Sequence, residues 1–214
     1  MKICIITANI GTIDEVHPPV TQTMEYELCY YTENTLPFPL PNLDNRMKAR
    51  YFKTQAHRFL DHDIFIWIDS SIEIINKDFV KIIVEYLKDA DIIVSKHKQR
   101  ESVYEELEYI IDKMKAGDKY LLRRYVKQPL YKEYEFYKKA ELPTDFPLYN
   151  SFFFAFKKDN QTKLLMNHWW DLILRFSNFD QSQFSFCLWY WMATLKVIET
   201  DDLFIRHKHN GYNL

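Results

Sequence analysis

The segment from Asp63 to Ile75, DIFIWIDSSIEII, contains a short apolar strand that ends at an acidic residue, Asp69. Five of the six residues before Asp69 are apolar, which is typical of a strand buried on both faces of a sheet. Open α/β sheets bind ligands in the crevice beyond the carboxyl ends of their strands, so we expect this carboxylate at such a crevice. There it is either a structural cap or a ligand for a metal or nucleotide.

The scarcity of glycine excludes the common phosphate-binding loops. The chain has only three glycines, Gly11, Gly117 and Gly211. A Walker loop or a dinucleotide-binding turn needs several glycines close together, so that backbone amides can approach the phosphates. If the protein binds a nucleotide, a metal ion or Arg, Lys and His side chains must therefore contact its phosphates.

The length and composition of the chain are ordinary for a globular protein. The 214 residues are 47% hydrophobic, and the formal net charge of −2 gives no electrostatic reason to expect nucleic acid as a partner. The three cysteines are widely spaced, which favours a reducing compartment over a disulfide framework or a thiolate zinc site. We find neither a signal peptide nor a transmembrane segment, and we expect a cytoplasmic protein. The oligomeric state is not predictable.

Strands and helices alternate along the first half of the chain, which is typical of a parallel βαβ sheet. The sequence predicts one α/β domain over residues 1–214, with a mixed, mostly parallel central sheet flanked by helices and a helical insertion at about 102–139. The expected strands are 2–8, 26–31, the segment ending at Asp69, 91–94, 149–156 and 196–205. The expected helices are 45–60, 78–87, 102–114, 120–139, 162–176 and 181–192.

A cationic stripe is expected on the helix that precedes the Asp69 strand. Arg50, Lys53 and His57 recur at spacings of three and four residues, which places them on one helical face. Arg46 is assigned to another face. The stripe suits a diphosphate, and the alternative interpretation is a solvated helix surface.

Two segments offer ligands for a divalent cation. In an extended chain Asp69, Ser71 and Glu73 point the same way, and Mg²⁺ or Mn²⁺ binds carboxylate and hydroxyl oxygens, often together with substrate phosphates. In the tail, His207 and His209 share a face if the segment is extended. The alternative for the tail is an exposed chain end.

A third group of polar and aromatic residues lies near the C-terminal helices. Asp180 is expected at the N-cap of the helix that starts at Gln181, where it is either only a cap or a general base that faces a cleft. Trp170 is a candidate for stacking on a sugar ring, although aromatic residues at helical spacing more often belong to the core.

The order of these segments resembles a known family. It runs from RYFKTQAHRFLDHDIFIWIDSSIEI through KHKQRESVYEE and FDQSQFSF to HKHN. This order is similar to that of nucleotide-sugar glycosyltransferases with the GT-A fold. The resemblance is to the plant and bacterial family formerly named as a domain of unknown function, and to the small glycosyltransferase domain of chlorella viruses.

The resemblance implies roles for individual residues. Asp69 corresponds to the first position of a DxD-type metal motif and Ser71 to its last, with His207 or His209 as the C-terminal imidazole ligand of Mn²⁺ or Mg²⁺. Ser71 replaces the usual carboxylate, which leaves metal dependence open, and Glu73 is the candidate to compensate for it. Asp180 corresponds to the carboxylate beside the anomeric centre. The implied substrate-binding residues are Asn9, Arg50, Lys53, His57, His97, Arg100, Glu105, Trp170 and Gln181.

The expected function is therefore metal-assisted transfer of a sugar from a nucleotide diphosphate donor, here taken as a UDP-sugar, to a glycan acceptor. Stabilising the charge that develops on the leaving diphosphate is the main requirement of this chemistry. A noncatalytic nucleotide- or carbohydrate-binding module of the same fold is the alternative. A metal-dependent phosphohydrolase is a third possibility, but such an enzyme usually needs more carboxylates.

Overall fold

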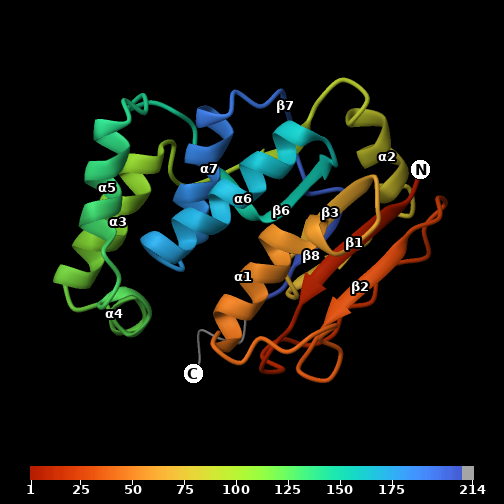
Figure 1. The fold of residues 1–214 in the computed structure, drawn as a ribbon, viewed down its shortest axis with the longest axis horizontal. Coiled ribbons are helices and arrows are strands. Elements are labelled where there is room, and N and C mark those ends of the chain that lie inside the picture. The colour runs from red at the N-terminus through yellow and green to blue at the C-terminus, as the bar shows by residue number, and fades with distance from the viewer. Residues whose placement is uncertain (209–214) are drawn as a thin grey trace.

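A six-stranded sheet forms the centre of the computed structural model, which describes residues 1–208 (Figure 1). The strand β6 is antiparallel to both of its neighbours, β3 and β5, and the other three pairings are parallel. The predicted mixed, mostly parallel α/β sheet is therefore confirmed. In spatial order the strands are β2 (Glu27–Tyr31), β1 (Ile3–Ala8), β3 (Ile64–Ile68), β6 (Tyr149–Lys157), β5 (Ile92–Lys96) and β7 (Leu195–Val197).

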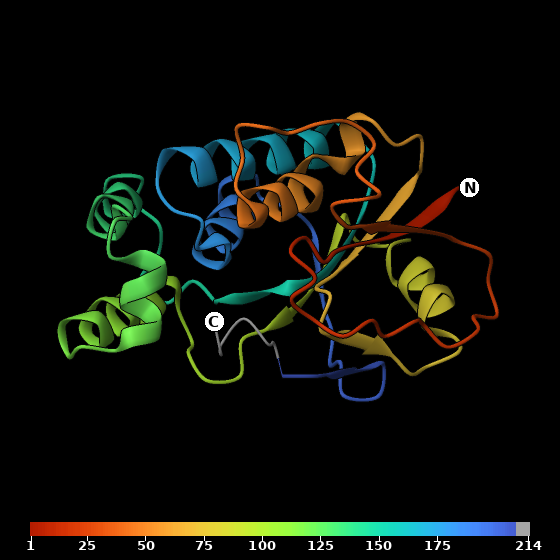
Figure 2. The same ribbon diagram turned by 90° about the horizontal axis from the view of Figure 1, so that it is seen from below.

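Helices cover both faces of this sheet, as Figure 2 shows. One face packs against α1 (Asn45–Gln55), α6 (Asn160–Arg175) and α7 (Asp180–Tyr190), and a short 3₁₀ turn, Ala56–Arg58, extends α1. The other face packs against α2 (Phe79–Tyr86) and the two-stranded sheet of β4 (Ile72–Ile74) and β8 (Phe204–Arg206).

The strand β1 shows why the central strands are apolar at every position. Cys4 and Ile6 contribute to the core on the α1 side, whereas Ile3 and Ile5 contribute to the core on the α2 side. All of β3 is buried in the same way, as its sequence predicts.

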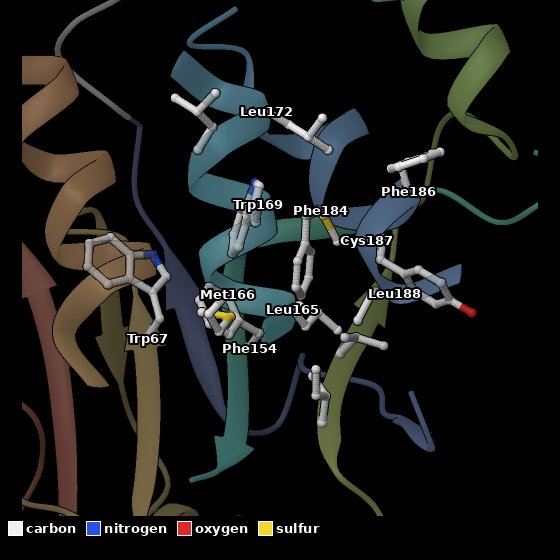
Figure 3. Close-up of a cluster of buried hydrophobic side chains, with 14 of the residues drawn as sticks. Trp67, Phe154, Leu165, Met166, Trp169, Leu172, Phe184, Phe186, Cys187 and Leu188 are labelled. Carbon is white, nitrogen blue, oxygen red and sulfur yellow. The ribbon is translucent and has the colours of Figure 1, made fainter. Parts of the chain in front are cut away.

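The aromatic residues of the C-terminal helices fill the core between the sheet and α6 and α7. Trp169 is fully buried and stacks on Phe184 with a centroid distance of 4.4 Å, and Phe154 of β6 contacts both rings (Figure 3). At Trp169 the core interpretation of the aromatic stripe is therefore correct.

Three helices, α3 (Val103–Lys115), α4 (Lys119–Tyr125) and α5 (Leu130–Lys139), form a group at one side of the molecule next to α7 (Figure 1). They occupy the predicted insertion. The single helix expected over 120–139 is wrong, because Pro129 separates α4 from α5.

The strand expected over 196–205 is also wrong. This segment turns at residues 201–203 and contributes β7 to the large sheet and β8 to the small one. Apolar alternation within the segment does not indicate which partner each half will pair with. Within residues 1–208, no helix combines the length and the apolar character that crossing a membrane requires.

Candidate active site

A cavity of about 1110 Å³ opens where three central strands meet at one edge of the sheet. The carboxyl ends of β1 and β3 lie beside the amino end of the antiparallel β6. The backbone amide of Asp69 donates to the carbonyl of Phe152 at 2.8 Å, which fixes the end of β3 there. Side chains from α1, α3, α4 and the start of α7 complete the walls. The predicted position of Asp69 at a ligand-binding edge is consistent with this geometry.

Lys53 connects two acidic residues at the base of this cavity. Its side chain is only 1% exposed, and its ammonium lies 2.7 Å from Asp180 Oδ2 and 3.4 Å from Asp69 Oδ1. The rings of Trp67 and Trp169 lie 5.4 and 5.8 Å from the same nitrogen. A buried cation needs such carboxylates, so Lys53 fixes the spacing between the two acidic residues.

Asp69 accepts a hydrogen bond from the indole N–H of Trp67 at 2.8 Å, and about a third of its side chain (35%) is exposed. Burial by itself raises the pKa of Asp69. The charges of Lys53 and Arg50, together with the Trp67 hydrogen bond, outweigh that effect and hold the pKa below its usual value. Asp69 is therefore ionised at neutral pH and available to a cation in the cavity.

Asp180 is the first residue of α7 and not its N-cap, which is Phe179. The capping interpretation is therefore wrong, because the carboxylate contacts Arg50 Nη2 at 3.1 Å and Lys53 at 2.7 Å instead. Its backbone carbonyl accepts from the Trp169 indole at 2.9 Å. Both carboxylate oxygens thus contact cations of α1.

The three residues expected on one extended face, Asp69, Ser71 and Glu73, do not share a face. A turn follows β3, in which the amide of Ile72 donates to the carbonyl of Asp69 at 3.0 Å. Ser71 is buried and lines the cavity. Glu73 instead contacts the His207 ring at 2.7 Å, so it is not placed to replace the missing carboxylate beside Asp69.

His207 lies on the cavity wall, and its ring stacks on His17 at 3.9 Å. Its backbone amide donates to the carbonyl of Ser71 at 2.8 Å. His17, Glu73 and His207 have ligand atoms within 4.8 Å of one another, and this group does not include Asp69. His209, also predicted as a metal ligand, lies outside the described residues.

Several other predicted residues line the cavity: Asn9, Arg50, His97, Arg100 and Gln181. Asn9 organises its loop, since its Oδ1 accepts from the amides of residues 13 and 14 at 3.0 and 3.1 Å. His97 Nδ1 accepts from the Arg100 amide at 3.0 Å. Burial, followed by the charge of Arg100, lowers the pKa of His97 to about 4, so the ring is neutral at pH 7.

Three predicted residues lie away from the cavity walls. His57 is in the 3₁₀ turn, buried in the core with its Nδ1 3.1 Å from the carbonyl of Thr54, because the helix ends before it can share the face of Arg50. Trp170 packs edge-on against Tyr51 at 5.4 Å. Glu105 is exposed and accepts from the amide of Glu101 at 2.7 Å, as residues in the first helical turn often do.

The sequence interpretation missed part of the cavity wall. Arg46 lines the cavity with Arg50, and their spacing of four residues was the available signal. Glu106, one residue after the predicted Glu105, forms an ion pair with Arg100. Arg123 and Arg124 come from α4. No local pattern shows that this helix faces α1.

Known structures resemble this chain at low sequence identity. No curated protein sequence matches the chain. A glycosyltransferase involved in the glycosylation of the major capsid of PBCV-1 is similar in structure over 100% of both chains, with a TM-score of 0.48 and 12% identity. Mouse xyloside xylosyltransferase 1, apo form, is similar over 82% of this chain, with a TM-score of 0.44 and 12% identity; the chain spans 64% of that protein.

The sequence itself carries the stronger match. Residues 37–209 match the family described as "TOD1/MUCI70, glycosyltransferase-like domain". These residues include Asp69, the cationic helix α1 and Asp180, and the predicted resemblance to glycosyltransferases is confirmed. The chain belongs to the TOD1/MUCI70 glycosyltransferase-like domain family.

Proposed function

We propose that the protein transfers a sugar from a nucleotide diphosphate donor, a UDP-sugar, to a glycan acceptor. The observation that supports this most directly is the chain of contacts from Asp69 through Lys53 to Asp180 and Arg50, at the ligand-binding edge of the sheet. Cations at this edge would stabilise a leaving diphosphate in a protein without a glycine-rich phosphate loop.

We assign different roles in such a transfer to different residues of the cavity. Arg50 is the accessible cation beside Asp180, with 15% of its side chain exposed, and it is the candidate partner of the donor phosphates. Asn9 holds the loop after β1 against the cavity. Asp180 is the candidate base for the acceptor hydroxyl, but one of its oxygens must exchange a contact with Arg50 or Lys53 to accept that proton.

The residues around Asp69 fit a divalent cation that is shared with the donor. Asp69 offers a partly exposed carboxylate, Ser71 a hydroxyl and His207 an imidazole on the same cavity wall. Asp69 does not belong to the described group of three potential metal ligands, which consists of His17, Glu73 and His207. A metal ion at Asp69 would therefore need ligands from the donor as well. Bound Mn²⁺ or Mg²⁺ would neutralise charge on the diphosphate, with phosphate oxygens completing its coordination.

This shared arrangement predicts that metal binding depends on the nucleotide. We expect calorimetry to detect weak Mn²⁺ binding to the free protein, and at least about tenfold tighter binding with saturating UDP, because the phosphates supply the missing ligands. Asp69→Asn should abolish the UDP-dependent gain. Equal Mn²⁺ affinity with and without UDP would contradict a shared site.

A panel of UDP-sugars, assayed for UDP release with and without glycan acceptors, tests the proposed function. We expect turnover with at least one donor. Asp180→Asn should lower the rate by about 10² to 10⁴ if Asp180 is the base. UDP binding without turnover of any donor would favour the noncatalytic module. A protein that binds neither UDP nor any UDP-sugar would contradict both.

A further inference from the structure

Four of the arginines that line the cavity fall into two kinds. Arg50 is paired with Asp180, and Arg100 is paired with Glu106, so carboxylates of the protein neutralise both. Arg46 and Arg124 differ: within residues 1–208, neither has a carboxylate oxygen within 4.0 Å. Among the described residues, these two guanidinium groups without carboxylate partners therefore line the same open cavity.

The two groups are close enough to influence each other. Burial, together with the charges of Arg124 and Arg50, lowers the pKa of Arg46 to about 10, against the opposing effects of Tyr125 and Asp44. The Asp44 carboxylate already accepts from the backbone amide of Met47 at 2.8 Å, as the N-cap of α1. Like charges held together in a cavity favour binding of an anion.

Arg124 is held in this position by aromatic rings. Its guanidinium carbon lies 4.9 Å from the centre of the Tyr120 ring and 5.5 Å from that of Tyr125. Its Nε is buried and has no hydrogen-bond partner among the described residues. The nearby Asp118 is the N-cap of α4, accepting from the amide of Leu121 at 2.9 Å. A buried donor without a protein partner in a cationic cavity can be satisfied by an acceptor on a bound ligand.

We propose that Arg46 and Arg124 form an anion-binding subsite for the acceptor, which therefore carries a carboxylate or phosphate group. This inference rests on the proposed function. Seven residues of α1 separate Arg46 from Lys53, or roughly 10 Å along the helix axis. Lys53 contacts Asp69, where the donor phosphates are expected, and Arg46 lies towards the other end of α1, one turn beyond Arg50, on the cavity wall that α4 also lines.

The test uses three monosaccharides that differ only at carbon 6, namely methyl glucuronide, methyl glucoside 6-phosphate and the neutral methyl glucoside, all of the same anomer. Each is titrated calorimetrically into the full chain saturated with UDP and Mn²⁺, and separately into the nucleotide-free protein. We expect at least one charged sugar to bind about tenfold more tightly than methyl glucoside, as for a charge-assisted contact. The charged sugar that binds more tightly identifies the anionic group of the acceptor as a carboxylate or a phosphate.

The double variant Arg46→Gln and Arg124→Gln should lose that preference, while its UDP affinity stays within about twofold of wild type. Lys119→Gln is the matched control, since it removes a charge from α4 at an exposed residue outside the cavity wall, and should keep the preference. Circular dichroism and thermal unfolding verify that the variants fold.

Three outcomes overturn the subsite. Equal affinity for charged and neutral sugars, or no binding of any of them, shows that no anion subsite exists. An equal loss in Lys119→Gln shows a general effect of net charge. A large loss of UDP affinity in the double variant assigns these arginines to the donor diphosphate. Failure of wild type to bind UDP contradicts the proposed function instead, and the nucleotide-free titrations still test the subsite.

Discussion

Lys53 is the residue on which the geometry of the candidate site depends most. Lys53→Met removes a fully buried cation, so Asp69 and Asp180 lose the positive charge that lies between their carboxylates. Breaking a buried ion pair from one side typically costs about 3–5 kcal/mol, so we expect a loss of unfolding free energy of this size and loss of UDP binding.

Urea unfolding and calorimetry with UDP measure the two effects. The control is Lys48→Met on the same helix, outside the cavity wall, which should change stability by less than about 0.5 kcal/mol. If Lys53→Met bound UDP as wild type does, the cation would be purely structural.

His57 shows how a residue predicted to bind phosphate contributes instead to acid sensitivity. Burial lowers the pKa of this imidazole to about 4, from a usual value near 6.5 in the unfolded chain. The unfolded state therefore binds the proton more strongly, and stability falls as the pH drops from about 6.5 towards 4. From one buried histidine this amounts to about 3 kcal/mol by pH 4.

The depressed pKa of Asp69 acts over a lower range. Its contribution is present above the unfolded pKa of about 3.9 and is lost as the pH falls through the folded value. Urea unfolding of wild type and His57→Gln at pH 7, 5.5 and 4.5 separates the two residues. We expect the unfolding free energy of the variant to fall less steeply with decreasing pH than that of wild type. An equal pH dependence would exclude His57 as the source of the acid sensitivity.

At the scale of elements, α5 is tied to the start of α7 through one buried carboxylate. Glu133 accepts hydrogen bonds from Ser177 at 2.8 Å, Ser182 at 2.5 Å and Gln183 at 3.3 Å, and these residues flank Asp180. Burial raises the pKa of Glu133, although these hydrogen bonds oppose the shift. The helical insertion thus helps to position the candidate base.

Glu133→Ala should therefore affect both stability and turnover. It leaves several buried donors without an acceptor, at a cost of about 3 kcal/mol or more. It should also lower kcat while leaving the KM for the UDP-sugar nearly unchanged, because the donor is expected near Asp69. Glu135→Ala, at an exposed residue on the same helix, is the control and should alter neither quantity. A change in stability alone would limit Glu133 to a structural role.

An element could be predicted where the residues that determine it lie within its own segment of the sequence. The buried strands β1 and β3 and the helix α1 follow from apolar periodicity, and the position of Asp69 follows from the end of β3. The insertion of β6 between β3 and β5 could not be predicted, because pairing is decided by tertiary packing. By contrast, the apolar residues of α3 place Glu106 beside the buried face of the helix and Glu105 on the exposed one, so this distinction was available in the sequence.

At the scale of the whole molecule, the last described strand carries the end of the chain back to the cavity. In β8, Arg206 pairs with Ile72, and the His207 amide donates to the carbonyl of Ser71. Both Arg206 and His207 line the cavity. The wall beside Asp69 is thus built from segments more than a hundred residues apart in sequence, which only the pairing of β4 with β8 brings together.

Two truncations test this arrangement. Ending the chain after Ile205 removes Arg206, His207 and their backbone hydrogen bonds, so we expect a loss of about 1–2 kcal/mol in stability and at least a tenfold loss in UDP affinity. Ending it after Lys208 keeps those bonds and should therefore cost less stability than the first truncation. Because this second truncation also removes His209, its Mn²⁺-dependent UDP affinity measures the contribution of that predicted ligand separately. Normal UDP binding after truncation at Ile205 would show that the end of the chain closes the small sheet without taking part in the site.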